Sequence, residues 1–241
     1  MSRSIFTLAA LVLGGVVVPP LSAQLPSMPQ IPGLGAASSS GLSDTKIASG
    51  LKEALSVGTQ KAVKLVDHPG GYLDNQAIKI LLPSNLRPVE SILRSAGQGP
   101  KIDEFVASMN HAAESAAPEA EKIFADAVTA MTIDDARKRL NGKDTAITDY
   151  FREKTSASLT AAFRPHVEKA MQANGVTQQY DALAGKIPAM PFAKSSSLDI
   201  DNYVVSKALD GLFYMLGQQE KAIRTNPAAR STALLKQVFG K

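Results

Sequence analysis

Cysteine and tryptophan are both absent from this chain of 241 residues. Without cysteine there can be no disulfide, no thiol nucleophile, no cysteine-ligated metal and no iron–sulfur cluster. Sugar-binding surfaces usually stack the sugar on tryptophan or tyrosine, so the lack of tryptophan disfavours a lectin-like role. The composition therefore removes several catalytic and binding classes before any motif is considered.

A strong excess of charge of one sign is also missing. The chain has 26 Lys and Arg residues against 22 Asp and Glu residues, a formal net charge of +4. Proteins that bind nucleic acid usually concentrate basic residues on one face, and this mild excess does not resemble that pattern. We therefore expect no nucleic-acid partner.

The first 23 residues have the three-part pattern of a secretory signal peptide. Arg3 supplies the positive start, residues 5–18 form an apolar run, and Leu21-Ser22-Ala23 offers small residues for cleavage. The apolar run is shorter than the roughly 20 residues that a membrane-spanning helix needs. Since no later segment is apolar enough either, we predict cleavage after Ala23 and no membrane span afterwards. The expected location is the periplasm, with secretion from the cell as the alternative.

A composition change separates this signal from the rest of the chain. Residues 24–43 are rich in Pro, Gly and Ser and carry no charge, which predicts a flexible tether. From Asp44 onward, apolar residues recur at spacings of three and four, which is the period of a helix. The expected organisation is a tether followed by a single helical domain over residues 44–241.

The pattern predicts an all-α, multi-helix bundle. Ser43 or Asp44 can cap the first helix, which ends at residues 68–71. Residues 72–83 are the least helical part, and the alternation of Ile78, Ile80 and Leu82 leaves open a short extended piece or a small hairpin there. Further helices are expected over residues 84–96, 100–116, from 118 onward, 132–142, 144–173, 177–184, 198–224 and from 227 to 240, with a Pro-rich loop at 185–197.

Two of these helices are especially informative. In the helix at 132–142, Thr132 and Asp135 form a capping pattern, and Asn141-Gly142 predicts a left-handed stop. The helix at 198–224 is apolar around more than half of its circumference, which is typical of the buried centre of a bundle. Its apolar residues are Val204, Val205, Ala208, Leu209, Leu212, Phe213, Met215 and Leu216.

Six short runs taken together resemble a known family. They are residues 49–55 (SGLKEAL), 131–136 (MTIDDA), 150–155 (YFREKT), 207–213 (KALDGLF), 223–227 (IRTNP) and 234–240 (LLKQVFG). In this order they resemble the domain-of-unknown-function family 4197 of Gram-negative bacteria, over about residues 42–240. The resemblance implies an exported helical domain, and it implies no activity because the family carries no assigned catalytic residues.

Metal and cofactor motifs are missing from the sequence. The three histidines, His68, His111 and His166, belong neither to an H-E-x-x-H pair nor to an E-x-x-H motif. The run from Asp199 to Asn202 begins like a calcium loop but lacks the later ligands and the glycine, so a helix cap is the better interpretation. Phosphate-binding glycine motifs do not occur. We expect no metal and no cofactor.

Two groups of residues keep an enzyme open as an alternative. Glu104, Ser108 and His111 can share one face of a helix, and His166 lies near the apolar edge of a long helix just after Pro165. A hydrolase could pair His111 or His166 with a carboxylate. No G-x-S-x-G elbow is present, and structural roles explain these residues more simply, so we assign no catalytic residue.

The most promising ligand-facing surface lies on the helix at 198–224. Lys207, Asp210 and Tyr214 form a stripe on its least apolar side, and Tyr203 and Gln218 extend that stripe. The stripe could line a polar pocket, although an exposed ion pair between residues three apart would explain it as well. We include this stripe in the predicted ligand site.

We add His166 to the predicted ligand site. For the function, the sequence leaves a leading hypothesis and two alternatives. The leading hypothesis is a non-catalytic module that binds an envelope protein or a small apolar ligand. The enzyme above is one alternative. The other is contact with the envelope surface through a C-terminal stretch whose bases, with no acid among them, are Lys221, Arg224, Arg230, Lys236 and Lys241.

Overall fold

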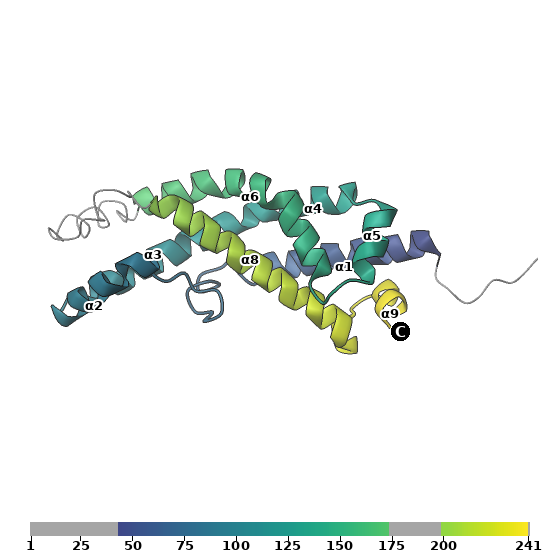
Figure 1. Cartoon of the computed structure of the whole chain (residues 1–241), viewed down its shortest axis with the longest axis horizontal. Helices are drawn as coiled ribbons and strands as arrows, with labels where there is room; N and C mark the ends of the chain where they lie inside the picture. Colours follow the sequence, from purple (N-terminus) through teal and green to yellow (C-terminus); the bar gives the residue numbers. More distant parts are fainter. Residues whose placement is uncertain (1–42, 174–198, 241) are drawn as a thin grey trace, which may run out of the picture. The chain divides into compact units, whose positions relative to one another are not determined.

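Helices are the only regular elements in residues 43–173 and 199–240, which are the residues that the computed structural model describes (Figure 1). In chain order, with short 3₁₀ helices marked η, they are α1 (Asp44–Lys64), η1 (Ser84–Leu86), α2 (Arg87–Ser95), α3 (Gly99–Ala116), η2 (Ala117–Glu119), α4 (Ala120–Ala130), α5 (Ile133–Leu140), α6 (Ala146–Ala173), α8 (Ile200–Thr225), η3 (Pro227–Ala229) and α9 (Ala233–Phe239). The all-α prediction is confirmed. The predicted signal peptide, the predicted tether up to residue 42, the predicted helix at 177–184 and the predicted loop at 185–197 lie outside the described residues.

Side-chain caps start three of these helices where the sequence predicts them. Ser43 accepts a hydrogen bond from the backbone N–H of Lys46 at the start of α1. Thr132 and Asp135 form the reciprocal capping box of α5. Asp199 caps α8 by accepting from the backbone N–H of Asn202. These caps satisfy donors that every helix N-terminus leaves unpaired, so they fix where the helices begin.

The left-handed stop predicted after α5 is wrong. Asn141 closes the helix with φ −88° and ψ 5°, and Gly142 does not have a positive φ. The last carbonyls of α5, those of Arg139 and Leu140, accept hydrogen bonds from the guanidinium of Arg224 on α8. Because a distant side chain satisfies these carbonyls, the helix ends without a left-handed residue.

The hairpin left open for residues 72–83 is also wrong. Residues 72–78 form turns and residues 79–83 form an irregular chain, and the described residues contain no strand. Ile78, Ile80 and Leu82 are buried, which explains their alternation with more exposed neighbours. The backbone of this segment pairs with side chains of α3 instead of with a second strand.

Helix α8 lies at the centre of the bundle, as predicted. It packs against α1, α3, α6 and α9, and of its predicted apolar residues only Met215 is less than fully buried. Helix α1 shares the centre, because it also contacts α4, α5 and α9 (Figure 1). The rings of Phe124, Phe151 and Phe213 meet where α4, α6 and α8 converge, with centroids 5.6 and 6.0 Å apart. Among the described helices, none is both long and apolar enough to cross a membrane.

A buried ion pair near the C-terminal end of α8 joins that end to the start of α6 and to the end of α5. The carboxylate of Glu220 accepts hydrogen bonds from the backbone N–H groups of Ile147 (3.1 Å) and Thr148 (2.8 Å), at the start of α6. The same carboxylate pairs with Arg224, at 2.9–3.0 Å, and Arg224 donates to the last carbonyls of α5. Glu220 therefore places negative charge at a helix N-terminus and Arg224 places positive charge at a helix C-terminus, which the helix dipoles favour.

Replacing Glu220 by alanine is expected to destabilise the fold strongly. The substitution leaves Arg224 without its carboxylate and two backbone N–H groups without an acceptor, and breaking a buried pair in this way costs about 3–5 kcal/mol. Urea unfolding followed by circular dichroism should show this loss in the free energy of unfolding.

The exposed pair between Lys122 and Asp126 on α4 provides the control. Its atoms are 2.8 Å apart, but both side chains are mostly exposed to solvent. Asp126→Ala should leave the unfolding midpoint nearly unchanged. If Glu220→Ala and Asp126→Ala unfold at the same urea concentration, the structural role given to Glu220 is wrong.

Candidate functional site

An open groove lies between the irregular segment after α1 and the central helix α8. Its volume is about 520 Å³. One wall is formed by residues 77–87 and the other by one face of α8. We call it the loop–α8 groove, and its lining residues are Ala77, Ile78, Lys79, Leu81, Leu82, Ser84, Arg87, Tyr203, Lys207, Asp210, Gly211 and Tyr214.

The loop wall is held in place by Asn110, which is fully buried on α3. Its side-chain carbonyl accepts from the backbone N–H of Ile80 at 2.8 Å, and its amide donates to the backbone carbonyl of Ile80 at 2.9 Å. The amide also donates to Val106 one turn earlier on α3, at 2.7 Å. The side chain thus pairs with Ile80 on both backbone groups, as a residue of a neighbouring antiparallel strand would.

One turn further along α3, Glu114 binds the beginning of the same segment. Its buried carboxylate accepts from the backbone N–H groups of Tyr72 (3.0 Å) and Leu73 (3.2 Å). The hydroxyl of Tyr72 in turn donates to the backbone carbonyl of Ala208 on α8, at 2.7 Å. Burial, and to a lesser degree the charge of Glu114, raises the pKa of Tyr72 far above its usual value, so the hydroxyl remains a donor.

The α8 wall carries the stripe predicted from the sequence. Lys207, Asp210 and Tyr214 all line the loop–α8 groove, and Tyr203 lines it one turn earlier. The hydroxyl of Tyr203 donates to the backbone carbonyl of Leu81 at 2.8 Å, which ties the two walls together. Burial raises the pKa of Tyr203, while the charge of nearby Arg87 opposes the shift. Gln218 does not line the groove.

The single carboxylate in the groove is already neutralised. Asp210 lies 3.1 Å from Arg152 of α6 and 3.5 Å from Lys207, so the predicted ion pair forms and gains a second cation. The guanidinium of Arg152 also lies over the Phe213 ring, 4.5 Å from its centroid. Ligand binding by Lys207, Asp210 and Tyr214 stays a prediction.

Two other bases line the groove without an ion-pair partner. Lys79 and Arg87, both on the loop wall, have no carboxylate within 4.0 Å among the described residues. Asp103 is close enough to Lys79 to feel its charge, but it pairs with Arg94 at 2.7 Å. That hydrogen bond from Arg94 is the main cause of the lowered pKa of Asp103, with a smaller contribution from Lys79.

Apolar surface is exposed in the same groove. Leu81 is 52% exposed and Tyr214 is 45% exposed, and they lie on opposite walls. Only three other large hydrophobic residues among those described are more than 40% exposed, namely Leu65 (42%), Ile92 (68%) and Ile133 (47%), and none of them lines the groove. The groove therefore combines unpaired positive charge with exposed apolar surface.

His166 is not part of this groove. Its Nε2 atom lies 3.3 Å from Oε1 of Glu119 in η2, and both side chains are nearly half exposed. The predicted type of pair, a histidine with a carboxylate, therefore exists. Neither residue lines the groove or either of the two hollows described below, so the pair is a surface contact between α6 and η2.

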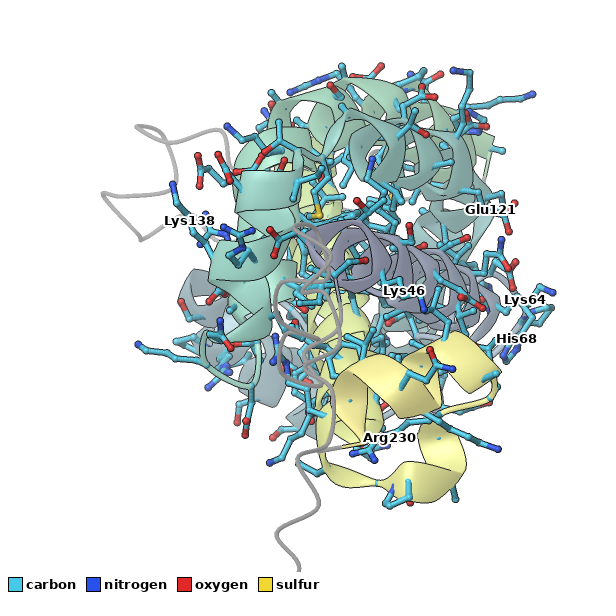
Figure 2. All side chains as sticks on the ribbon, turned by 90° about the vertical axis from the view of Figure 1, so that its right-hand side faces the viewer. Lys46, Lys64, His68, Glu121, Lys138 and Arg230 are labelled. Atoms are coloured by element: carbon cyan, nitrogen blue, oxygen red, sulfur yellow. The ribbon has the colours of Figure 1, made fainter. Side chains whose placement is uncertain are left out.

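The other predicted histidine arrangements do not form a site. Ser108 is buried whereas Glu104 and His111 are exposed, and no hydrogen bond joins these three described residues. His68 is exposed, close to Lys64 at the outer edge of the domain (Figure 2), and its ring lies against the carbonyl of Pro69. In the part of the chain that the structure describes, no three His, Cys, Asp or Glu residues are grouped to hold a metal ion.

Two further hollows offer fewer unpaired groups to a ligand. One is an internal void of about 10 Å³ beside Glu220, which is too small for a ligand larger than water. The other is a surface hollow of about 550 Å³ between α4, α5 and α6. Its charged residues include Asp135, which belongs to the α5 capping box, and Asp126, which pairs with Lys122. These groups already have structural partners.

The basic C-terminal stretch is partly used inside the fold. Arg224 pairs with Glu220, and Arg230 donates to the backbone carbonyls of Ile223 and Arg224 at 2.9 Å each. Figure 2 shows Arg230 within the C-terminal segment drawn in yellow. Lys221 and Lys236 are the bases of this stretch that remain exposed in the described residues. Among the described bases of this stretch only Arg224 pairs with an acid, so contact with an anionic surface stays a prediction.

Sequence reasoning missed Asn110 and Glu114 as the residues that build the groove. Both fall among the apolar residues of α3, next to Met109 and Ala113, and a polar residue inside an apolar helix face is a usable signal. It also missed Lys79 and Arg87 as lining residues of the groove. Their segment has no regular spacing from which one could predict that both side chains face the same side.

Comparison with known proteins identifies the family. A family model described as "Protein of unknown function (DUF4197)" matches residues 41–240, nearly the whole chain, so the chain belongs to this family. The resemblance seen in the sequence is thereby confirmed. No match was found among curated proteins or among solved structures.

The loop and α8 are in such close contact at Gly211 that adding a single methyl group there should destabilise the fold. A Cβ atom at Gly211 would lie 2.6 Å from the Tyr72 ring and 3.1 Å from Ile78. Gly211→Ala should therefore lower the free energy of unfolding by about 1–3 kcal/mol through overpacking. Chemical denaturation measures this change.

Gly58 in α1 is the matched control. A Cβ atom there would meet side-chain atoms only at 3.8 Å or more. Gly58→Ala should raise the free energy of unfolding by about 0.5–1 kcal/mol, because alanine favours the helix. An increase in stability for Gly211→Ala as well would contradict the tight packing described for the groove wall.

Proposed function

We propose that this member of the DUF4197 family is a non-catalytic binding protein of the bacterial envelope that holds a small ligand in the loop–α8 groove. The observation that carries the proposal is the lining of this groove. Leu81 and Tyr214 expose apolar surface there, and Lys79 and Arg87 add charges without partners. Exposed apolar surface rimmed by polar residues is typical of ligand-binding grooves.

The size and the rigidity of the groove support this role. Its volume of about 520 Å³ falls within the range of roughly 300–1,000 Å³ that small-molecule sites occupy. Its loop wall is fixed by Asn110 and Glu114 before any ligand arrives. A preformed site avoids the entropic cost of ordering a loop upon binding.

The chemistry of the lining argues for binding over catalysis. No histidine lines the groove, and its one carboxylate, Asp210, is held by two cations. Ser84 is a lining hydroxyl, but among the described residues no base lies within hydrogen-bond distance to activate it. The histidine–carboxylate pair of His166 and Glu119 lies elsewhere on the surface, so it does not supply the missing base.

The envelope location rests on the first residues of the sequence. Residues 1–23 have the pattern of a cleavable signal peptide and residues 24–43 have the composition of a tether. We place the protein in the periplasm, with its helical domain free to reach a ligand. Secretion from the cell is the alternative location.

Native mass spectrometry of the protein purified gently from its own cells tests both parts of this proposal. We expect a chain that begins at Gln24, and we expect a fraction of the molecules to carry a small bound molecule. Tyr214→Ala should lose that bound mass, since it removes the exposed aromatic ring from the groove.

The matched control is Ile133→Ala, because Ile133 is exposed to a similar degree, 47%, but does not line the groove. It should keep the bound molecule. A wild-type chain that carries no added mass would contradict a stable ligand complex. A chain that retains residues 1–23 would contradict the predicted export.

A further inference from the structure

We propose that the ligand is an anionic amphiphile, with a phosphate or carboxylate head held by the bases of the loop–α8 groove and an apolar chain laid against Leu81 and Tyr214. The inference rests on the proposed function, because it assigns a chemical class to the ligand of the same groove. It is carried by the presence of unpaired positive charge and exposed apolar surface in one lining.

The charges of the groove select for an anion. Its lining contains three bases, Lys79, Arg87 and Lys207, and one acid, Asp210. The acid is compensated by Lys207 and by Arg152, which approaches from α6. The charge that remains in the groove is therefore that of Lys79 and Arg87, and both are positive.

The two acids close to these bases have a different ion-pair partner, Arg94. Asp103 of α3 senses Lys79 but is bonded to Arg94 at 2.7 Å. Glu90, on the same helix as Arg87, pairs with Arg94 as well, at 2.9 Å. Because both carboxylates hydrogen-bond to Arg94, neither of them forms an ion pair with Lys79 or Arg87.

The shape of the available groups fits a phosphate or carboxylate head. A guanidinium offers two parallel N–H donors that match two oxygens of either group, and a lysine adds a point charge. The hydroxyl of Tyr203 is committed to the carbonyl of Leu81, so the head would be recognised mainly by charge.

The apolar half of the groove requires more than a free inorganic anion. Leu81 and Tyr214 expose about half of their surface, and the mostly buried side chains of Ile78 and Leu82 also line the groove. A ligand without an apolar part would leave this surface in water, and covering it yields about 25 cal/mol per Å². Charge and apolar area together therefore favour an amphiphile.

Isothermal titration calorimetry on the purified protein can compare ligands that differ only in the head group. The probes are decyl phosphate, decanoate and decyltrimethylammonium, each below its micelle concentration, together with inorganic phosphate. We expect the two decyl anions to bind at least about ten-fold more tightly than the cation. Inorganic phosphate should bind more weakly than decyl phosphate.

Charge reversal locates the head group. Arg87→Glu and Lys79→Glu should each weaken the binding of decyl phosphate by roughly five-fold or more, because a local attraction becomes a repulsion. Lys169→Glu is the control, because it makes the same change of net charge away from the groove. Lys169 is exposed on α6, does not line the groove and has no ion-pair partner within 4.0 Å among the residues that the structure describes. Circular dichroism confirms that all three variants remain folded.

The possible outcomes separate the two proposals. Equal affinity for decyltrimethylammonium and decyl phosphate, with binding lost in Tyr214→Ala, would overturn the anionic class and keep the groove as a ligand site. No binding of any decyl probe would overturn the amphiphile inference, while a small bound mass on the purified protein would still support the groove as a ligand site. Binding to phosphatidylglycerol vesicles, without binding of monomeric decyl phosphate, would indicate contact with a membrane surface and would also overturn the inference.

Discussion

The groove exists because two side chains of α3 satisfy the backbone of a segment that has no secondary structure of its own. Asn110 pairs with both backbone groups of Ile80, and Glu114 accepts the N–H groups of Tyr72 and Leu73. A buried backbone group without a partner costs about 1–3 kcal/mol, so an irregular segment can be buried only where such partners are supplied. The buried amide and carboxylate therefore allow residues 72–83 to pack closely against α8 and form a wall.

Side chains of α8 satisfy the backbone groups of other segments in the same way. Glu220 accepts two N–H groups at the start of α6, and Arg224 donates to the last carbonyls of α5. In both places a polar side chain of one helix completes the backbone hydrogen bonds of another segment. Such buried networks hold neighbouring elements in one arrangement when every member is satisfied. The loop–α8 groove consequently has walls that are set by the fold and need no rearrangement to receive a ligand.

The sequence predicts the parts of this structure that depend on neighbouring residues. Helical spacing reveals the bundle and its apolar centre, and local capping patterns such as Thr132 with Asp135 set helix starts. Spacing along α8 also brings Lys207, Asp210 and Tyr214 to one face. Spacing cannot reveal that Ile80 pairs with a residue 30 positions later, and this is why the sequence leaves a hairpin open for that segment. The partner of His166, the second cation on Asp210 and the contribution of Lys79 depend on tertiary packing in the same way.

Amide hydrogen exchange at Ile80, measured by nuclear magnetic resonance on the wild-type protein, tests the central claim most directly. If Asn110 holds the loop wall, the Ile80 amide should be protected to nearly the same degree as amides in the interior of α8. The neighbouring Leu81 amide has no acceptor among the described residues and should exchange much faster. Equally fast exchange at Ile80 and Leu81 would show that the wall is not held, and the account of a preformed groove would be wrong.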